Sequence, residues 1–315
     1  VAVDTMGNLL ATKRGTGESD LRVLVDAHMD EVGLLVIDID SSGMLKFTHV
    51  GGFDDRALLG KLVQVGPKKV TGVIGARAIH LLKRSEFSKV VKIDAMRIDI
   101  GAKSRDAAGS KVKVGDYAAF LTEYEELAAE NGGRSAIGKA FDNRAGCAVL
   151  IELLRGERFP FDLVASFSVQ EEVGVRGAKV ASYSVRPDVA LVLECTPAND
   201  LPNEHDASPN VALGKGAAVY VMDARTIQDP RLVGHLMATA EANGISFQVR
   251  QPGGGGTNTG AIQRAGPGIP AATLAVPGRY AHTPSMMIDL DDYESVIRLA
   301  DAGLRRLTPE LIRRS

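Results

Sequence analysis

The sequence predicts an α/β fold, with a mixed-sheet α/β/α sandwich as the main domain and a small β-barrel-like domain inserted into it. Three observations carry this prediction. An apolar strand-like run begins near residue 21, strands and helices alternate from residue 140 onward, and a β-rich block lies between them. A β-rich block within an α/β series indicates an insertion. We therefore expect a discontinuous main domain, residues 1–46 and 136–315, and an inserted domain, residues 47–135.

The composition excludes several classes of protein. The 315 residues include 37 Lys and Arg against 39 Asp and Glu, so we expect neither nucleic acid nor an anionic membrane as a partner. Apolar runs are shorter than the ~18 to 20 residues of a membrane span and no signal-peptide pattern is present, which favours a cytoplasmic protein. The absence of tryptophan argues against a sugar-stacking cleft. Cys147 and Cys195 lie in apolar contexts, which favour buried reduced thiols.

The first elements are a strand at residues 9–13 and the apolar run from residue 21. This run ends in ionisable residues, with His28 at its end and Asp30 two positions later. Asp30 is well placed to hold the second imidazole nitrogen of His28, which is how histidine ligands are usually oriented. Taken alone, the spacing favours a hydrogen-bonded surface pair.

The block at residues 47–135 contains β-like runs separated by glycines. The predicted strands are residues 61–65, 70–79, 90–100 and 111–120. Residues 123–130 alone have a helical pattern. These runs predict a small barrel or sandwich, and such insertions often serve contacts or gating.

Asp142 precedes a helix predicted at residues 145–154. Aspartate is a preferred N-cap residue, so helix capping alone explains its position. A carboxylate at a strand-to-helix junction also offers two oxygens, each of which can bind a separate cation. The sequence leaves both interpretations open.

Two further strand patterns end in carboxylates. The run from residue 162 is followed directly by Glu171 and Glu172, and the strand at residues 186–197 carries Glu194 near its end. Ligands of open α/β sheets gather beyond the carboxyl ends of the strands, where one glutamate can bind a metal while its neighbour moves a proton. An isolated Glu-Glu pair is more often a solvated loop. Repetition of the pattern favours a site.

A helix at residues 230–243 and a strand at residues 245–250 lead to a loop with four successive glycines. The loop has neither the lysine of a P-loop nor the spacing of a Rossmann fingerprint. Because backbone without side chains allows a ligand to approach closely, we expect a wall of a substrate pocket that includes Gly255, Gly256 and Thr257.

The last strand, residues 271–276, is followed by Arg279, Tyr280 and His282. Arg279 and Tyr280 are further candidates for substrate binding, and His282 is a second histidine at a strand end. An amphipathic helix at residues 290–307 closes the chain.

A parallel-type sheet would bring these strand ends to one edge. The site residues expected there are His28, Asp142, Glu171, Glu172, Glu194 and His282. Imidazoles with carboxylates suit zinc, cobalt or manganese, whereas a thiolate site would need cysteines in other positions. The set exceeds the ligands of one tetrahedral ion and predicts two divalent ions about 3.5–4 Å apart that share a carboxylate.

Four motifs follow one another along the chain. They are AHMDEVG at residues 27–33, FDNR at 141–144, VQEEVGVRGA at 169–178 and RYAH at 279–282. In this order they closely resemble the tetrahedral, or glutamyl, aminopeptidase family of dinuclear metallopeptidases. The similarity covers essentially the whole chain, including the inserted β domain.

The resemblance implies a role for each site residue. Glu171 is the implied general base, and Asp30 orients a histidine ligand. The implied metal ligands are His28 and Glu194 on one ion, Glu172 and His282 on the other, and Asp142 on both.

The resemblance also implies an activity and an assembly. We expect an aminopeptidase that hydrolyses the N-terminal residue from short peptides, using a two-metal-activated water, and that self-associates into dimers and a tetrahedral dodecamer. One alternative is a metal-dependent deacylase or carboxypeptidase, which needs a cationic group such as Arg279. Another is a non-catalytic scaffold with a decayed site.

Two residues depart from the family pattern. Glu194 stands where aspartate is usual, although its longer side chain still reaches a metal. Asn258 replaces an aspartate expected in the glycine-rich loop, and we expect it to alter the pocket.

Members of the family also carry a helical segment before the stretch that opens this chain, so we expect the start to be incomplete. Some relatives are labelled endoglucanases, which does not follow from these residues.

Overall fold

The computed structural model describes residues 1–128, 133–201 and 210–313. These residues form two compact units. The large unit comprises Val1–Asp30, Glu125–Ala281 and Met286–Ser315, and the small unit comprises Glu31–Tyr124 and His282–Ser285. Within the described ranges, no helix combines the length and the apolar character needed to cross a membrane.

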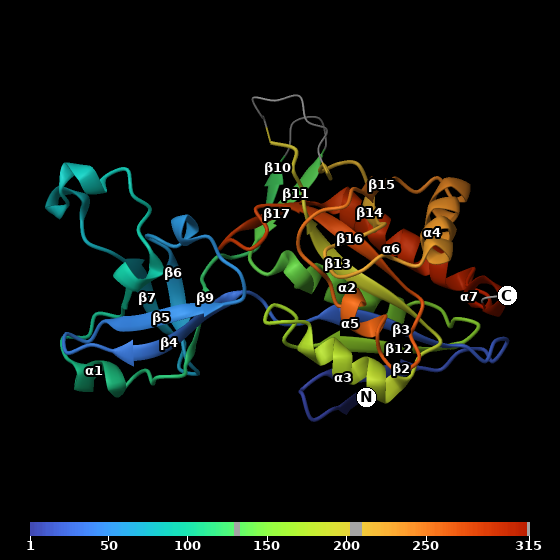
Figure 1. Cartoon of the computed structure of the whole chain (residues 1–315), viewed down its shortest axis with the longest axis horizontal. Helices are drawn as coiled ribbons and strands as arrows, with labels where there is room; N and C mark the ends of the chain where they lie inside the picture. Colours follow the sequence, from blue (N-terminus) through green and yellow to red (C-terminus); the bar gives the residue numbers. More distant parts are fainter. Residues whose placement is uncertain (129–132, 202–209, 314–315) are drawn as a thin grey trace. The chain divides into compact units, whose positions relative to one another are not determined.

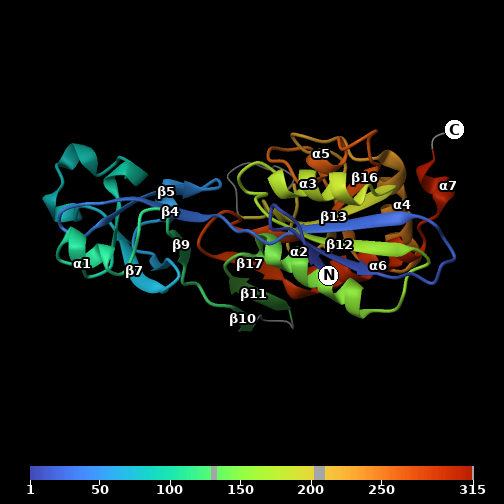
Figure 2. The same cartoon turned by 90° about the horizontal axis from the view of Figure 1, so that it is seen from below.

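The large unit is built on a mixed sheet (Figure 1 and Figure 2). Its spatial order is β1 (Ala2–Val3), β2 (Leu9–Lys13), β12 (Asp162–Ser168), β3 (Arg22–His28), β13 (Val189–Pro197), β16 (Ala271–Arg279), β17 (Met286–Asp289), β11 (Arg134–Gly138) and β10 (Glu125–Ala128), with β14 (Ala217–Tyr220) beside β16 and β15 (Phe247–Arg250) beside β14. The central strands β12, β3, β13 and β16 are parallel. Ser168 pairs with His28 in this register. The carboxyl ends of these strands therefore meet at one edge of the sheet, where ligands gather in open α/β folds.

Helices cover both faces of this sheet. The helices on one face are α2 (Phe141–Arg155), α4 (Pro230–Ala242) and α6 (Leu290–Arg305), and those on the other are α3 (Arg176–Val185) and α5 (Thr259–Ile262). The short α7 (Pro309–Ile312) contacts α4. The predicted α/β/α sandwich with a mixed sheet is confirmed.

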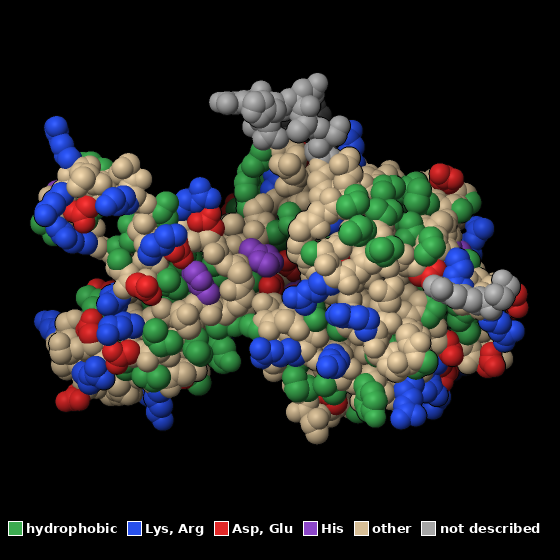
Figure 3. Space-filling model, viewed as in Figure 1, with side chains coloured by type: hydrophobic (Ala, Val, Ile, Leu, Met, Phe, Trp, Pro, Cys, Tyr) green, Lys and Arg blue, Asp and Glu red, His purple; other side chains and the backbone are tan. Residues whose placement is uncertain are grey.

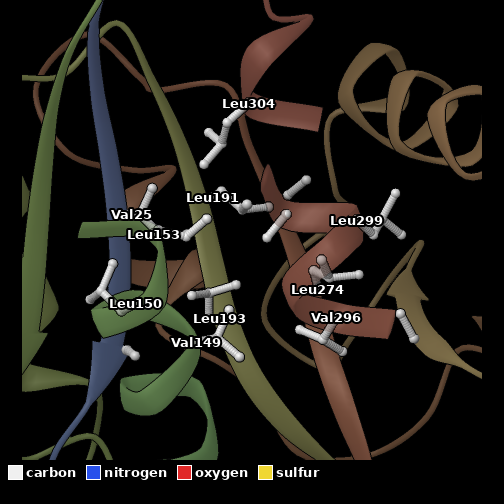
Figure 4. Close-up of a cluster of buried hydrophobic side chains, with 14 of the residues drawn as sticks. Val25, Val149, Leu150, Leu153, Leu191, Leu193, Leu274, Val296, Leu299 and Leu304 are labelled. Carbon is white, nitrogen blue, oxygen red and sulfur yellow. The ribbon is translucent and has the colours of Figure 1, made fainter. Parts of the chain in front are cut away.

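Alternation along the central strands divides the side chains between the two faces. In β3, Val23 and Val25 belong to the larger apolar cluster, whereas Leu24 packs into the cluster on the opposite face. Figure 4 shows Val25 among side chains of β13 and β16 and of helices α2 and α6. Both faces of the strand are buried, as expected for parallel strands covered by helices. His28 is four residues after Leu24 on this strand, so strand alternation places both side chains on the same face.

The small unit is a closed antiparallel barrel. Its order is β4 (Gly33–Ile39), β5 (Leu45–Val50), β8 (Arg97–Asp99), β7 (Val70–Gly75), β6 (Leu62–Val65) and β9 (Tyr117–Phe120), with β9 pairing back to β4. Short helical turns connect these strands: α1 (Arg105–Gly109), η1 (Asp55–Ala57), η2 (Ile79–Leu81), η3 (Arg84–Glu86) and η4 (Ile93–Ala95). Leu34, Val36, Val63 and Val65 point inward and are fully buried. The closed strand order confirms the predicted inserted barrel. Inward apolar residues alternate with outward ones along its strands, which is the pattern of a barrel.

The boundaries of the two units differ from those predicted. The barrel begins at β4, so residues 31–46 belong to it and not to the main domain, and residues 125–135 belong to the large unit. The β-like character of the block did not distinguish strands that pair within the barrel from those that extend the large sheet. The predicted strands also proved longer than β7, β8 and β9.

The helix predicted at residues 123–130 is wrong over its described part. Residues 125–128 form β10, which pairs antiparallel with β11, and residues 129 and 130 lie outside the described ranges. Glutamate, leucine and alanine favour helix locally, but pairing with β11 overrides that preference. Helix propensity is weak compared with tertiary pairing.

Gly177 lies where α3 approaches the end of β12. A Cβ at this position would lie 2.2 Å from Val169 O and 2.4 Å from Asn8 Oδ1. Asn8 is fully buried and joins the two segments, accepting from Val169 N at 2.9 Å and donating to Gly177 O at 3.0 Å. The close approach requires glycine.

We expect Gly177→Ala to lower the free energy of unfolding by about 1–3 kcal/mol through overpacking. Urea denaturation followed by circular dichroism measures this change. Gly234→Ala on α4 is the matched control, since a Cβ there would meet no other atom within 4 Å and the exchange should stabilise the helix by up to about 1 kcal/mol. Equal stability of the two variants would contradict the packing role of Gly177.

Candidate metal centre

His28 lies at the centre of the site, at the end of β3. It is only 1% exposed, and its Nε2 lies 3.2 Å from Asp142 Oδ1 and 3.2 Å from Glu194 Oε1. One donor atom from each of these three residues lies within 4.8 Å of the others. They come from β3, the start of α2 and β13, so the parallel sheet brings together residues that are far apart in the sequence.

Glu171 and Glu172 lie on the turn that follows β12. Donor atoms of both glutamates and of His28 also lie within 4.8 Å of one another. The turn is closed by hydrogen bonds from Gly174 N and Val175 N to Glu171 O, at 2.9 and 2.8 Å. A continuing strand would point two adjacent side chains in opposite directions. The turn instead allows both glutamate side chains to approach one histidine.

Asp30 contacts both the histidine and the glutamate turn. His28 Nδ1 lies 3.1 Å from the Asp30 backbone oxygen and 3.6 Å from Asp30 Oδ1. The carboxylate of Asp30 accepts hydrogen bonds from Glu171 N at 3.0 Å and Glu172 N at 3.1 Å. The sequence pointed to the histidine contact, but nothing in it indicated that Asp30 also holds the backbone of both glutamates.

Capping does not explain the position of Asp142. The backbone is non-helical at Asp142 and Asn143, and Asn143 Oδ1 accepts a hydrogen bond from Gly146 N at 3.1 Å. Asn143 also donates to Leu193 O at 2.9 Å and is fully buried. Asn143 therefore accepts the hydrogen bond of a free amide at the start of the helix, and the Asp142 carboxylate lies against His28.

Close packing of these ionisable groups shifts their pKa values. Burial, together with the Glu194 carboxylate, raises the pKa of Glu171 to about 8. Burial likewise raises the pKa of Glu194 to about 7, against the opposing effect of His28. For His28, burial lowers the pKa, but the Glu194 and Asp142 carboxylates outweigh it, so its pKa is well above the usual range. Carboxylates this close repel one another, and cations among them would remove that repulsion.

The two cysteines lie directly behind the site and bind backbone oxygens. Cys147 Sγ donates to His28 O at 3.1 Å, and Cys195 Sγ donates to Phe141 O at 3.0 Å. Burial raises the pKa of the Cys147 thiol to about 11 and that of Cys195 well above its usual range. Both are free and buried, as predicted. Protonated thiols of this kind support the backbone and are poor metal ligands.

His282 belongs to the small unit. Its Nδ1 lies 3.0 Å from Gly52 O, within that unit. This contact fixes the orientation of the imidazole through one ring nitrogen, in the way that ligand histidines are often held. Its place among the metal ligands stays a prediction.

The glycine-rich loop contains both exposed and buried positions. Gly255 is exposed with φ +81° and accepts from Ala224 N at 2.9 Å, whereas Thr257 is 4% exposed and its hydroxyl donates to Asp223 Oδ2 at 3.2 Å. A Cβ at Gly256 would lie 2.5 Å from Arg225 Cδ, so a side chain there would require the Arg225 side chain to move. The Thr257 hydroxyl is thus held inside the fold, and the role of this loop as a pocket wall stays a prediction.

Asn258 is also buried. Its Nδ2 donates to Asp26 Oδ2 at 2.8 Å and to Ser168 Oγ at 2.9 Å, and all three residues are fully buried. Burial raises the pKa of Asp26. The Asn258 side chain therefore lies in a buried polar cluster between strands and loop, and its effect on a pocket stays a prediction.

Arg279 and Tyr280 differ in their surroundings. Arg279 binds Asp200 through two hydrogen bonds, from Nε at 2.6 Å and from NH2 at 2.7 Å. This carboxylate holds the pKa of Arg279 above its usual value. Tyr280 is 47% exposed with φ +64°. The guanidinium is engaged by a protein carboxylate, whereas Tyr280 stays a candidate for substrate contact.

Nearly the whole chain is similar to one known family. A family model described as M42 glutamyl aminopeptidase matches residues 7–299. A glutamyl aminopeptidase of Lactococcus lactis subsp. cremoris is 31% identical over 296 residues, covering 92% of this chain and 82% of the relative.

Solved structures show the same similarity. A TET aminopeptidase from the marine sediment archaeon Thaumarchaeota archaeon SCGC AB-539-E09 superposes with a TM-score of 0.92 at 35% identity, over 99% of this chain and 88% of that chain. The TET1 peptidase of Pyrococcus horikoshii, described as able to assemble into a tetrahedron or a large octahedral shell, superposes with a TM-score of 0.82 at 33% identity, over 97% of this chain and 89% of that chain.

Proposed function

The chain belongs to the M42 glutamyl aminopeptidase family, and from this premise we propose that it is a two-metal aminopeptidase that removes N-terminal residues from short peptides. The observation that supports the metal centre is the approach of His28, Asp142 and Glu194 donor atoms to within 4.8 Å. Imidazole and carboxylate are the donor types that bind zinc, cobalt and manganese. This donor set therefore fits a divalent cation.

The ligands are divided between two ions. His28 and Glu194 would hold one ion, Glu172 and His282 would hold the other, and Asp142, with two carboxylate oxygens, would serve both. When bound, two such ions polarise a scissile carbonyl and lower the pKa of a water from ~15.7 toward 7. Glu194 is 5% exposed on β13 and would be the carboxylate ligand that this strand supplies.

Glu171 acts as the general base. Its carboxylate accepts a proton from the attacking water and returns it to the departing amine. Asp30 fixes the position of this residue through the bond to Glu171 N, and it fixes His28 through the contacts to Nδ1. The two adjacent glutamates then differ in role, with Glu172 as a metal ligand and Glu171 as the base.

Binding of a substrate carboxylate at Arg279 is disfavoured. A carboxypeptidase or an acidic-substrate deacylase needs a cationic group that is available to the ligand. Because Arg279 already forms a bidentate pair with Asp200, it is a weak candidate for that recognition. An aminopeptidase needs no such group.

Self-association is part of the proposal. We infer dimers that build a larger closed particle through the barrel, because the Pyrococcus horikoshii relative is described as forming such shells and matches 97% of this chain. The cytoplasmic location and the dodecameric state stay predictions.

We expect the purified protein to release p-nitroaniline from unblocked aminoacyl substrates and to leave N-acetylated ones uncleaved. Chelation should reduce the rate more than about 100-fold, and zinc, cobalt or manganese should restore it. A panel of glutamyl, lysyl and leucyl substrates reports the side-chain preference. Full activity after complete removal of metal, or equal cleavage of the acetylated substrates, would contradict the proposal.

A further inference from the structure

A groove with a volume of about 930 Å³ lies between α3 and α5 on the large unit. Its charged lining residues are all basic: Arg176, Lys179, Arg225 and Arg264. Val175 and Ala265 also line it. Figure 3 shows Lys and Arg side chains gathered over α3 and α5, whose positions are seen in Figure 1. The chain as a whole carries a net charge of −2, so this concentration of positive charge is local.

The cations of the groove are available to a ligand. Arg176, Lys179, Arg225 and Arg264 are exposed, and within the described ranges none of them is in an ion pair with a carboxylate. Arg264 donates a side-chain hydrogen bond from Nε to Gly260 O at 2.6 Å, which leaves its charge without an acidic partner among the described residues. This differs from Arg279, which is neutralised by Asp200. Basic side chains that converge without acidic partners form a site for anions.

The groove borders the turn that carries Glu171. Gly174 and Val175 line the groove, and their backbone N–H groups bind Glu171 O. On the other side, Arg225 packs against Gly256 of the glycine-rich loop. A peptide held by its amino terminus beside Glu171 advances about 3.3 Å per residue when extended, so residues a few positions downstream reach such a groove.

We propose that this groove binds carboxylates of the peptide substrate downstream of the cleaved bond, so that the enzyme favours peptides with acidic residues near the amino terminus. The inference rests on the proposed aminopeptidase function and adds a substrate class to it. Lys179 and Arg225 contribute charge from opposite walls, on α3 and on the loop before α4. Recognition of this kind lowers KM and leaves the bond-breaking step unchanged, because the contacts are equal in ground state and transition state.

Three peptides test the inference with the metal-loaded protein. Leu-Gly-Gly-Glu-Glu-amide carries side-chain carboxylates, Leu-Gly-Gly-Gln-Gln carries only the terminal carboxylate, and Leu-Gly-Gly-Gln-Gln-amide carries neither. At about 0.01 M salt, where charges act over about 30 Å, we expect KM for the glutamate peptide to be about 5- to 10-fold below that of the neutral amide, and the difference to vanish near 1 M salt. The free-acid peptide shows whether the terminal carboxylate suffices.

Lys179→Glu should abolish this preference while leaving hydrolysis of leucine p-nitroanilide unchanged, since that substrate ends at the first residue. Lys215→Glu is the matched control, because Lys215 is exposed on the same unit and does not line the groove. One KM for all three peptides, or the same loss of preference in both variants, would overturn the inference and leave the aminopeptidase intact. Failure of the metal-loaded protein to hydrolyse any substrate would instead overturn the proposed function, and this inference with it.

Discussion

Glu171→Gln is expected to lower kcat by about 10²- to 10⁴-fold, which is the usual contribution of a general base. Glutamine keeps the size of the side chain and its place on the turn but cannot accept the proton from water. The hydrogen bonds that hold Glu171 to Asp30 and within the turn are made by its backbone and not by its own carboxylate, so the fold should be unchanged. Steady-state kinetics on an aminoacyl p-nitroanilide measures the loss, and elemental analysis should find the same metal content as in the parent protein.

Glu157→Gln is the matched control for this variant. The Glu157 side chain is 92% exposed, and the same exchange there should leave kcat unaltered. Turnover of Glu171→Gln within twofold of the parent would reject the role of Glu171. A parallel loss of metal would assign it to the ligands instead.

Asp142→Ala is expected to remove both metal ions as well as activity. Residues that only support ligands cost about 10–100-fold in metal affinity when mutated, and a bridging ligand should exceed that range because it serves two ions. The His28 imidazole also loses its neighbour at 3.2 Å. Metal content after dialysis and the rate at saturating zinc or cobalt are the two measurements.

Asp289→Ala separates this effect from helix capping. The Asp289 carboxylate caps α6 by accepting from Asp291 N at 2.8 Å and Asp292 N at 3.1 Å. Its loss should cost about 1 kcal/mol of stability and no metal. If Asp142→Ala behaved in the same way, with lower stability and full metal content, the bridging role would be refuted.

Prediction of the fold from the sequence succeeded where a pattern is local. The strand at residues 9–13 coincides with β2, and the helix predicted at 230–243 coincides with α4 to within one residue. The start of α3 carried no comparable signal, because it follows Val175 at φ +52° without a capping side chain. Helices that begin without a capping residue lack the clearest local marker.

The resemblance to the family is confirmed, whereas the individual roles of the site residues stay predictions. His28 and Glu194 were inferred from strand ends, and the parallel register explains why these two side chains lie close together: the ends of β3 and β13 lie at the same edge of the sheet. Thr257 and Asn258 show the limit of this reasoning. Their neighbours in the sequence suggested an open loop, but both side chains are buried.

The sequence by itself determined which donor types are present and the order in which they follow the strands, since apolar runs and their ends are visible in a few consecutive residues. Only the tertiary structure decided which contacts these residues make. Asp30 binds the amide of Glu171, 141 positions away, and Arg279 binds Asp200, 79 positions away. Hydrogen bonds depend on distance and direction in space, and a single chain position carries no record of the partner that folding brings to it.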